Sequence, residues 1–214
     1  MRGVKAEATP DVIEYLVRHS GQDEVLARVE RETAGMPGAG MQITPDEGAL
    51  LTILVRLLEA ENVLEVGTFT GYSAICLARG LPAGGRLTCL ELEHEFADIA
   101  ERNLEDAGLT DRVEIVVGPA QASLERMPEE PVFDLVFLDA DKPGYPAYYE
   151  LIVPRLKGNG LLLVDNTLLH GEVLDPQDER SRAIDELNDA IARDERVDSA
   201  MVLVADGLTF VRKR

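Results

Sequence analysis

Oxygen-bearing side chains follow two apolar runs in the second half of the chain. The run VFDLVFLD ends at Asp139, and the run GLLLVDN ends at Asp165 and Asn166. Because the carboxyl ends of neighbouring parallel strands meet at one edge of a sheet, these side chains are expected to converge there. Two carboxylates and one amide oxygen, with no Cys or His, suit Mg²⁺, with Ca²⁺ or Mn²⁺ as alternatives, and do not suit zinc. Such protein ligands leave positions for water and for substrate oxygens.

Lys142 stands three residues after Asp139, on the loop that leaves the same strand end. A free lysine is charged at neutral pH, so it can act as a base only where a nearby cation or burial favours the neutral amine. Direct coordination to a metal would acidify a phenol at the same time. An aspartate after a strand is also a common turn former or helix cap. The combination at two strand ends favours a catalytic site over that simpler interpretation.

A glycine-rich turn follows the first apolar strand, in LEVGTFTGYS at 64–73. Gly67 and Gly71 suit a tight turn and close strand–helix packing, which let an adenosine-bearing ligand reach the carboxyl ends of the strands. Dinucleotide and phosphate binders use G-x-G-x-x-G or G-x-x-x-x-G-K-[ST], whereas this turn is G-x-x-x-G with Glu65 before it. A carboxylate suits an ammonium group better than a pyrophosphate, so the turn favours an amino-acid ligand. The alternative is a tight turn without a ligand.

Polar residues also stand at the ends of the next two strands. Glu91 ends the second strand, 24 residues after Gly67, about where Rossmann-like sheets place the acid that binds ribose. In the segment GPAQ at 118–121, a small residue can face an adenine ring and Gln121 can bond the ring edge. The alternatives are a solvated glutamate and an ordinary residue of a helix N-terminus.

Short β-branched runs alternate with amphipathic stretches, the pattern of a mostly parallel sheet covered on both faces. Strands are predicted at Asn62–Val66, Arg86–Glu91, Val113–Val117, Val132–Leu138 and Gly160–Val164. Helices are predicted between them at Tyr72–Arg79, His94–Ala107, Gln121–Met127 and Ala147–Leu156. The repeating unit is therefore βαβ.

The C-terminal section differs from this repeat. A charged helix near Asp178–Asp194 precedes strands at Ser199–Val204 and Leu208–Arg212, which join through ADG at 205–207. Asp-Gly between two apolar strands is a strong hairpin signal, so an antiparallel pair is expected to close the sheet. The predicted fold class is α/β, a Rossmann-like doubly wound sheet of seven strands with the last strand antiparallel. A meander packed beside the sheet is the alternative.

Three helical segments are predicted before the first strand, at Asp11–His19, Gln22–Thr33 and Pro45–Glu59. Thr44 and Glu47 have the spacing of a capping box at the start of the third segment. The whole chain fits a single domain, with residues 1–60 as a lid or dimer element on a core of residues 61–214.

The 214 residues carry 40 acidic and 21 basic side chains, a formal charge of −19. Such a charge repels phosphate backbones and anionic lipids, so neither a nucleic acid nor a membrane is expected as a partner. Its simplest explanation is solubility, and a field that attracts cations is the alternative. No apolar run approaches the roughly 20 residues that span a bilayer, and no secretory signal is evident, so a cytoplasmic protein is expected. Cys76 and Cys89 are expected to be buried thiols.

With these motifs together, the chain resembles the caffeoyl-CoA and catechol O-methyltransferase family, particularly its bacterial members. The likeness covers nearly the whole sequence, through GMQITPDEGALL, LEVGTFTGYSA, LDADKPGY, VDNTLLHGEV and VADGLTFVRK. The resemblance implies S-adenosylmethionine and a divalent cation as cofactors, and a small molecule as the methyl acceptor. It also implies a homodimer.

The resemblance assigns roles residue by residue. It implies that S-adenosylmethionine is contacted by Ile43, Glu65, Gly67, Thr68, Ser73, Glu91, Ala120 and Asp141. Asp139 and Gln121 are included in this cofactor site. The cation ligands implied by the same match are Asp139, Asp165 and Asn166. Lys142 would be the general base and contact the substrate, and His170 falls where family members present a substrate-contacting side chain. An ordinary loop histidine is the alternative for His170.

Two departures from the family concern the substrate. The catechol branch has bulky aromatic walls near the lysine, whereas this chain has ADKPGY at 140–145 and no tryptophan. The plant coenzyme A ester branch has basic residues for the nucleotide, whereas this chain is strongly acidic. A coenzyme A thioester is therefore disfavoured, and a catechol, a free phenolic acid or a flavonoid is expected.

The expected reaction is methyl transfer to one oxygen of a vicinal dihydroxy aromatic, after Lys142 removes a phenolic proton. Two other functions remain as alternatives. A nicotinamide-dependent Rossmann-fold oxidoreductase would share the sheet and the ribose-binding acid, but the G-x-x-x-G turn disfavours it. A non-catalytic cofactor-binding protein would not need the combination of Asp139, Lys142, Asp165 and Asn166.

Overall fold

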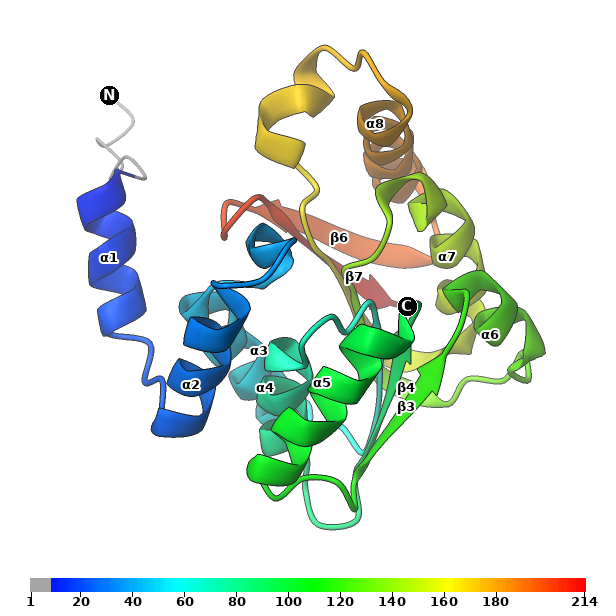
Figure 1. Cartoon of the computed structure of the whole chain (residues 1–214). Helices are drawn as coiled ribbons and strands as arrows, with labels where there is room; N and C mark the ends of the chain where they lie inside the picture. Colours follow the sequence, from blue (N-terminus) through cyan, green and yellow to red (C-terminus); the bar gives the residue numbers. More distant parts are fainter. Residues whose placement is uncertain (1–8) are drawn as a thin grey trace.

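The computed structural model describes residues 9–214 as a central sheet with helices on both faces (Figure 1). The strands lie in the order β3-β2-β1-β4-β5-β7-β6. Their bounds are β1 Asn62–Val66, β2 Arg86–Glu91, β3 Val113–Val117, β4 Phe133–Leu138, β5 Leu156–Val164, β6 Val197–Val202 and β7 Leu208–Lys213. Strands β1 to β5 pair in parallel, and β7 is antiparallel to both of its neighbours, β5 and β6. The predicted seven-stranded fold is confirmed, and the C-terminal hairpin joins the sheet instead of packing beside it.

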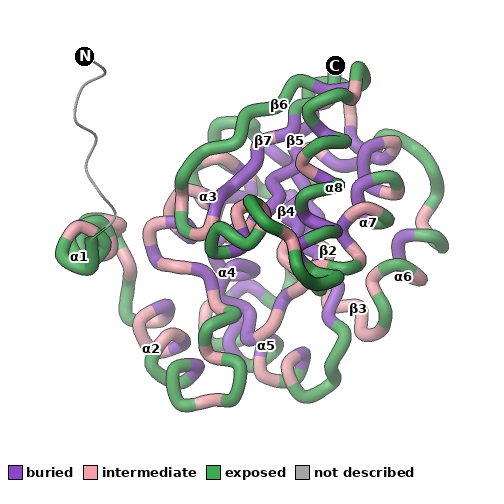
Figure 2. The backbone as a smooth tube through the Cα atoms, turned by 90° about the horizontal axis from the view of Figure 1, so that it is seen from above, coloured by how far each residue is buried: buried purple, intermediate pink, exposed green. Residues whose placement is uncertain are grey.

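Two sets of helices cover the sheet, with α2 to α5 on one face and α6 to α8 on the other (Figure 1). Their bounds are α2 Glu24–Thr33, α3 Pro45–Leu57, α4 Tyr72–Gly80, α5 His94–Asp106, α6 Ala120–Arg126, α7 Tyr145–Ile152 and α8 Glu179–Arg193. Each face has its own apolar core, because side chains alternate along a strand. In β1, Val63 belongs to one core, and Leu64 and Val66 belong to the other. The buried strands lie at the centre of Figure 2.

Helix α1 (Pro10–Arg18) contains no buried residue and stands away from the sheet (Figures 1 and 2). Its side chains Ile13, Tyr15 and Leu16 are exposed. The predicted N-terminal element also includes residues 1–8, which lie outside the described residues.

The predicted capping box at the start of α3 is wrong. The side chain of Thr44 makes no capping hydrogen bond, and its hydroxyl is buried without a partner. Glu47 is only 1% exposed and lies near the carboxylates of Asp139 and Asp165, so it does not reach back to the Thr44 amide. The spacing of Thr44 and Glu47 therefore does not mark a capping box, because Glu47 faces the two aspartates.

The predicted helix Ala147–Leu156 ends earlier, at Ile152, in α7. Pro154 lacks a backbone N–H and its ring crowds the preceding turn, so a short 3₁₀ turn, Val153–Arg155, replaces the last helical turn. Strand β5 then begins at Leu156 and shifts register against β4 between Phe133 and Leu135.

Both cysteines, Cys76 and Cys89, are free and buried, as predicted. Within residues 9–214, none of the helices combines the length and the apolar character needed to cross a membrane.

Candidate active site

The carboxyl ends of β1, β4 and β5 bring the predicted residues to one edge of the sheet. The Asp139 amide donates to the Val66 carbonyl at 2.9 Å, and the Asp165 amide donates to the Leu138 carbonyl at 3.0 Å. Gly67 has φ +93°, and a Cβ on it would lie 1.9 Å from the Asp139 carbonyl oxygen. Glycine is therefore required at position 67, where the glycine-rich turn meets the strand end that carries Asp139.

Glu65 lies in β1 and is completely buried. Neither of its carboxylate oxygens accepts a hydrogen bond of standard geometry. Burial raises the pKa of Glu65 to about 7, although the nearby Ser73, Cys89 and Thr68 side chains oppose the rise. A buried carboxylate without a donor costs free energy that a cationic ligand would offset. Glu65 therefore fits the ammonium end of an amino-acid ligand such as S-adenosylmethionine.

Glu91, at the end of β2, closes the glycine turn. One carboxylate oxygen accepts from the amides of Thr68 at 3.1 Å and Phe69 at 2.7 Å, and the other accepts from the Glu93 amide at 3.0 Å. Because a carboxylate offers about four acceptor positions, capacity remains for a ribose hydroxyl. The glutamate is 6% exposed, so the solvated alternative does not describe it.

The other predicted cofactor residues differ in their surroundings. Ile43 and Ser73 are buried, and Ala120 begins α6. Gln121 donates to Glu125 at 2.9 Å along the exposed face of α6. Its contact with an adenine ring remains a prediction.

Asp141 has local partners for both of its carboxylate oxygens. One accepts from the Gly144 amide at 3.2 Å, and the other accepts from the Tyr148 hydroxyl at 2.5 Å. These bonds fix the turn that follows β4. The predicted contact of Asp141 with the cofactor remains a prediction.

The predicted cation ligands lie around a buried carboxylate. Asp165 is 2% exposed, and burial, with the charge of Asp139 as the next cause, raises its pKa to about 7 against the opposing charge of Lys142. The backbone N–H of Asn166 donates to an Asp165 carboxylate oxygen at 2.7 Å. Two aspartates that repel each other in a buried place form a set that a divalent cation would stabilise.

Glu47 was not predicted as a site residue. One of its oxygens is buried without a hydrogen-bond partner, and burial together with the charges of Asp165 and Asp139 raises the pKa of Glu47 to about 10. Among the described residues, no group of three or more His, Cys, Asp and Glu side chains is arranged to hold a metal ion. Glu47 therefore lies beside the aspartates without completing a three-carboxylate cage. The sequence does contain a sign of this position. Leu51 and Val55 follow Glu47 at intervals of four residues, so all three lie on the same buried face of α3.

Lys142 lies between an acid and a phenol. Its amine donates to an Asp139 carboxylate oxygen at 2.8 Å and to the Tyr145 hydroxyl at 2.6 Å, and the side chain is 14% exposed. The Tyr145 hydroxyl lies 3.3 Å from the carbonyl oxygens of Leu138 and Asp165. Tyr145 is completely buried, which raises its pKa well above the usual value. This tyrosine, which the sequence did not single out, fixes the amine beside the strand ends.

His170 lies on the loop after β5, with its side chain 80% exposed. Its ring nitrogen Nδ1 is 3.5 Å from a carboxylate oxygen of Asp206. The structure thus places His170 on an exposed loop, four residues after Asn166.

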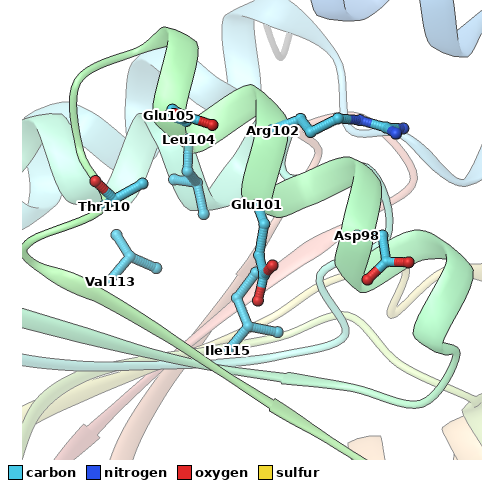
Figure 3. A pocket seen from close by; sticks show the side chains of 8 residues that line it. All are labelled: Asp98, Glu101, Arg102, Leu104, Glu105, Thr110, Val113 and Ile115. Atoms are coloured by element: carbon cyan, nitrogen blue, oxygen red, sulfur yellow. The ribbon is translucent and has the colours of Figure 1, made fainter.

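A surface hollow of about 510 Å³ lies apart from this site, between α5 and β3 (Figure 3). Its lining residues are Asp98, Glu101, Arg102, Leu104, Glu105, Thr110, Val113 and Ile115. None of the predicted site residues lines it, so the hollow is separate from the candidate active site.

Comparison with known proteins gives consistent matches. A model of the O-methyltransferase family matches residues 17–214. Caffeoyl-CoA O-methyltransferase 2 of Petunia hybrida is 34% identical over 204 residues, which cover 90% of this chain and 84% of that protein. The O-methyltransferase of Bacillus cereus in complex with S-adenosylhomocysteine (SAH) has a TM-score of 0.87 at 35% identity, over 95% of this chain and 97% of that chain. TomG of Streptomyces achromogenes, involved in tomaymycin synthesis and solved with S-adenosylmethionine, has a TM-score of 0.86 at 32% identity, over 95% and 96%.

The strand order, the glycine turn and these matches define a class I, S-adenosylmethionine-dependent methyltransferase. Within that class, the chain belongs to the O-methyltransferase family that includes the caffeoyl-CoA enzymes. The predicted family and enzyme class are confirmed, and the nicotinamide-dependent alternative is set aside.

Proposed function

We propose that this O-methyltransferase acts on a small vicinal dihydroxy aromatic, such as a catechol, a phenolic acid or a flavonoid, with the help of a divalent cation. The observation that carries the proposal is the largely buried acidic group at the ends of β4 and β5. There, Asp139 and Asp165 lie beside Glu47 and in reach of one ammonium group, that of Lys142.

The charges of this group favour a cation. Glu47 lies close to Asp139 and Asp165, the Lys142 ammonium group pairs with Asp139, and one oxygen of Glu47 has no partner. Asp139, Asp165 and Asn166 would hold the ion, and their oxygen atoms suit Mg²⁺ best. When bound, a divalent ion supplies charge neutralisation at the substrate oxygens.

Lys142 is assigned as the base. Asp139 and the Tyr145 hydroxyl bond to its amine. These two bonds fix the position of the amine at the end of the otherwise flexible lysine side chain. With a divalent cation bound nearby, the Lys142 ammonium group loses a proton more readily, and the neutral amine then takes the proton of one phenolic hydroxyl. The phenolic oxygen then forms a bond to the methyl carbon while the sulfur–carbon bond breaks, and SAH leaves. Holding the reacting atoms near contact distance contributes most of the acceleration.

Glu65 serves the methyl donor. The amino-acid end of S-adenosylmethionine carries an ammonium group, and Glu65 is a buried carboxylate whose oxygens accept no hydrogen bond of standard geometry. Gly67 keeps the turn free of a side chain, so the donor can approach the strand ends closely.

A free aromatic is proposed in preference to a coenzyme A ester. The relatives include enzymes named for caffeoyl-CoA, but the formal charge of −19 repels the phosphates of coenzyme A. The exposed His170 provides a polar contact for a small substrate at the edge of the site.

A homodimer is proposed as the working form. Exposed apolar side chains on α1 and α3, including Leu16, Ile53 and Leu57, supply surface that a second copy would cover. Sedimentation equilibrium is expected to give twice the chain mass, and a monomer at micromolar concentration would contradict this proposal.

The test is methyl transfer from labelled S-adenosylmethionine to a panel of aromatics. The panel contains dihydroxy compounds, their monomethyl ethers and caffeoyl-CoA, each with Mg²⁺ and after removal of metal with EDTA. Methylation is expected only for the free dihydroxy compounds, and only in the assays that contain Mg²⁺. Full turnover after EDTA would overturn the role of the cation, and preference for caffeoyl-CoA would overturn the proposed substrate class.

A matched pair of variants separates the cation site from general charge effects. Asp165→Asn removes a buried carboxylate at the site, and Asp189→Asn removes one on the exposed surface of α8. Asp165→Asn is expected to lose Mg²⁺-dependent turnover, whereas Asp189→Asn is expected to keep it.

A further inference from the structure

The segment 165–171 folds into a left-handed turn after β5. Asn166, Leu169 and His170 have φ of +56°, +44° and +52°, and Gly171 follows at +87°. L-residues seldom adopt these angles, and each such residue costs free energy unless its surroundings hold it. The turn therefore depends on contacts with other parts of the molecule.

The hairpin between β6 and β7 makes those contacts with its backbone. The amide and the hydroxyl of Thr167 donate to the Gly207 carbonyl, at 2.9 and 3.0 Å, and the Leu168 amide donates to the Asp206 carbonyl at 3.0 Å. A Cβ on Gly207 would lie 2.5 Å from the Leu168 side chain. Two segments 40 residues apart in the sequence thus form one unit.

The side chain of Asp206 reaches the left-handed residues directly. One of its carboxylate oxygens accepts from the His170 amide at 2.7 Å, and the other lies 3.5 Å from the His170 ring. The Asp206 side chain is 17% exposed, whereas the ring of His170 is 80% exposed. The Asp206 carboxylate thus fixes the backbone at His170 through a short charge-assisted hydrogen bond, while the His170 ring stays accessible to solvent.

We infer that Asp206 is a positioning residue, whose carboxylate holds the left-handed turn that sets the places of Asn166 and the His170 ring. Since Asn166 is a cation ligand and His170 a substrate contact only under the function proposed above, this role rests on that proposal. Asp206 acts through the turn in two ways. It supports cation affinity through Asn166, and it influences which of two neighbouring hydroxyls is methylated through His170.

Three variants test this role. Asp206→Ala removes the acceptor, and Asp206→Asn keeps an acceptor oxygen but removes the charge. Asp198→Ala is the control, because Asp198 lies on the same hairpin, is half exposed and pairs with Arg212 and Arg214 at the surface. The measurements are amide hydrogen exchange at 166–171, Mn²⁺ affinity by electron paramagnetic resonance with SAH present, SAH affinity, and the ratio of the two monomethyl products of 3,4-dihydroxybenzoate.

Asp206→Ala is expected to raise exchange at 166–171 by about tenfold or more. It is also expected to weaken Mn²⁺ affinity about tenfold, as loss of a group that orients a metal ligand does, and to shift the product ratio. SAH affinity is expected to stay within about twofold, since Glu65 and Gly67 lie on β1 and its turn. Asp206→Asn is expected to show effects of roughly two- to threefold, because a neutral bond replaces a charge-assisted one. Asp198→Ala is expected to match the parent protein in every measurement.

Unchanged exchange at 166–171 in Asp206→Ala would overturn the positioning role, whatever the cation does. Absence of Mn²⁺ binding by the parent protein would instead contradict the proposed function, and hydrogen exchange would still decide the role of Asp206. If Asp206→Ala loses protection throughout the protein, Asp206→Asn decides. A rise confined to 166–171 supports the role, and parent-like exchange there overturns it.

Discussion

The buried carboxylate of Glu65 predicts that cofactor binding depends on pH near neutrality. Burial raises the pKa of Glu65 to about 7 in the cofactor-free protein. As the proposed partner of the SAH ammonium group, Glu65 must be ionised, because a protonated carboxyl group carries no charge and presents a hydrogen of its own. Below pH 7 the carboxyl group must therefore lose a proton before SAH binds, and the apparent affinity falls as the pH falls.

The size of this effect follows from the pKa. A group with a pKa of about 7 is ionised to about one tenth at pH 6, one half at pH 7 and nine tenths at pH 8. The Kd for SAH is therefore expected to rise roughly tenfold from pH 8 to pH 6.

Stability of the cofactor-free protein is expected to change in the opposite direction. Because the folded pKa of Glu65 lies above its ordinary value of 4.5, the folded state binds more protons than the unfolded state between these two values. The contribution of Glu65 to stability therefore falls as the pH rises from about 4.5 to 7. SAH supplies the missing partner, so its stabilising effect is expected to be greater at pH 8 than at pH 6.

Isothermal titration calorimetry with SAH at pH 6, 7 and 8, in two buffers that differ in ionisation enthalpy, measures both the Kd and the protons released. Glu65→Gln is expected to bind more weakly at pH 8 and to lose the dependence on pH. Glu61→Gln, at an exposed position just before β1, is the matched control and is expected to behave as the parent protein. A constant Kd from pH 6 to pH 8 in the parent, or an unchanged pH dependence in Glu65→Gln, would refute this account of the cofactor site.

Three other substitutions test the site. Lys142→Ala is expected to lower kcat by about 100-fold or more with little change in SAH affinity; full turnover at pH 7 would rule out the assignment as base. Gly67→Ala is expected to abolish SAH binding and lower Tm, because its Cβ would lie 1.9 Å from the Asp139 carbonyl oxygen; differential scanning fluorimetry with and without SAH checks this, and parent-like values would show that the turn adapts. Glu47→Gln is expected to raise the Tm of the metal-free protein by removing a buried acid, and to weaken Mn²⁺ binding; a Tm below that of the parent would contradict the repulsion inferred at this site.

The fold was predictable because its elements follow local rules. The β-branched runs gave the seven strands within a few residues, and Asp206-Gly207 marked the hairpin that completes the sheet. Parallel strands also place their carboxyl ends together, so the meeting of Asp139 with Asp165 followed from topology.

The parts that were not predicted depend on contacts between distant segments or on competing uses of one pattern. Glu47 has the spacing of a helix cap, yet its helical phase turns it toward Asp165 and Asp139. Gln121 donates to Glu125 on its own helix. Its place after a strand end, from which its role was predicted, does not indicate this bond. The support of His170 by Asp206 joins residues 36 positions apart, which no local spacing encodes.

The insertion of β7 between β5 and β6 has a consequence for the order of assembly during synthesis. The glycine turn and β1 to β5 leave the ribosome before the hairpin does, so the parallel strands can begin to pair before β7 is available. The turn that carries Asn166 gains its support only when Gly207 has emerged, 40 residues later. A chain stopped before this point would leave the turn at 165–171 without its hydrogen-bond partners at Asp206 and Gly207, so this turn is completed after the strands that carry it.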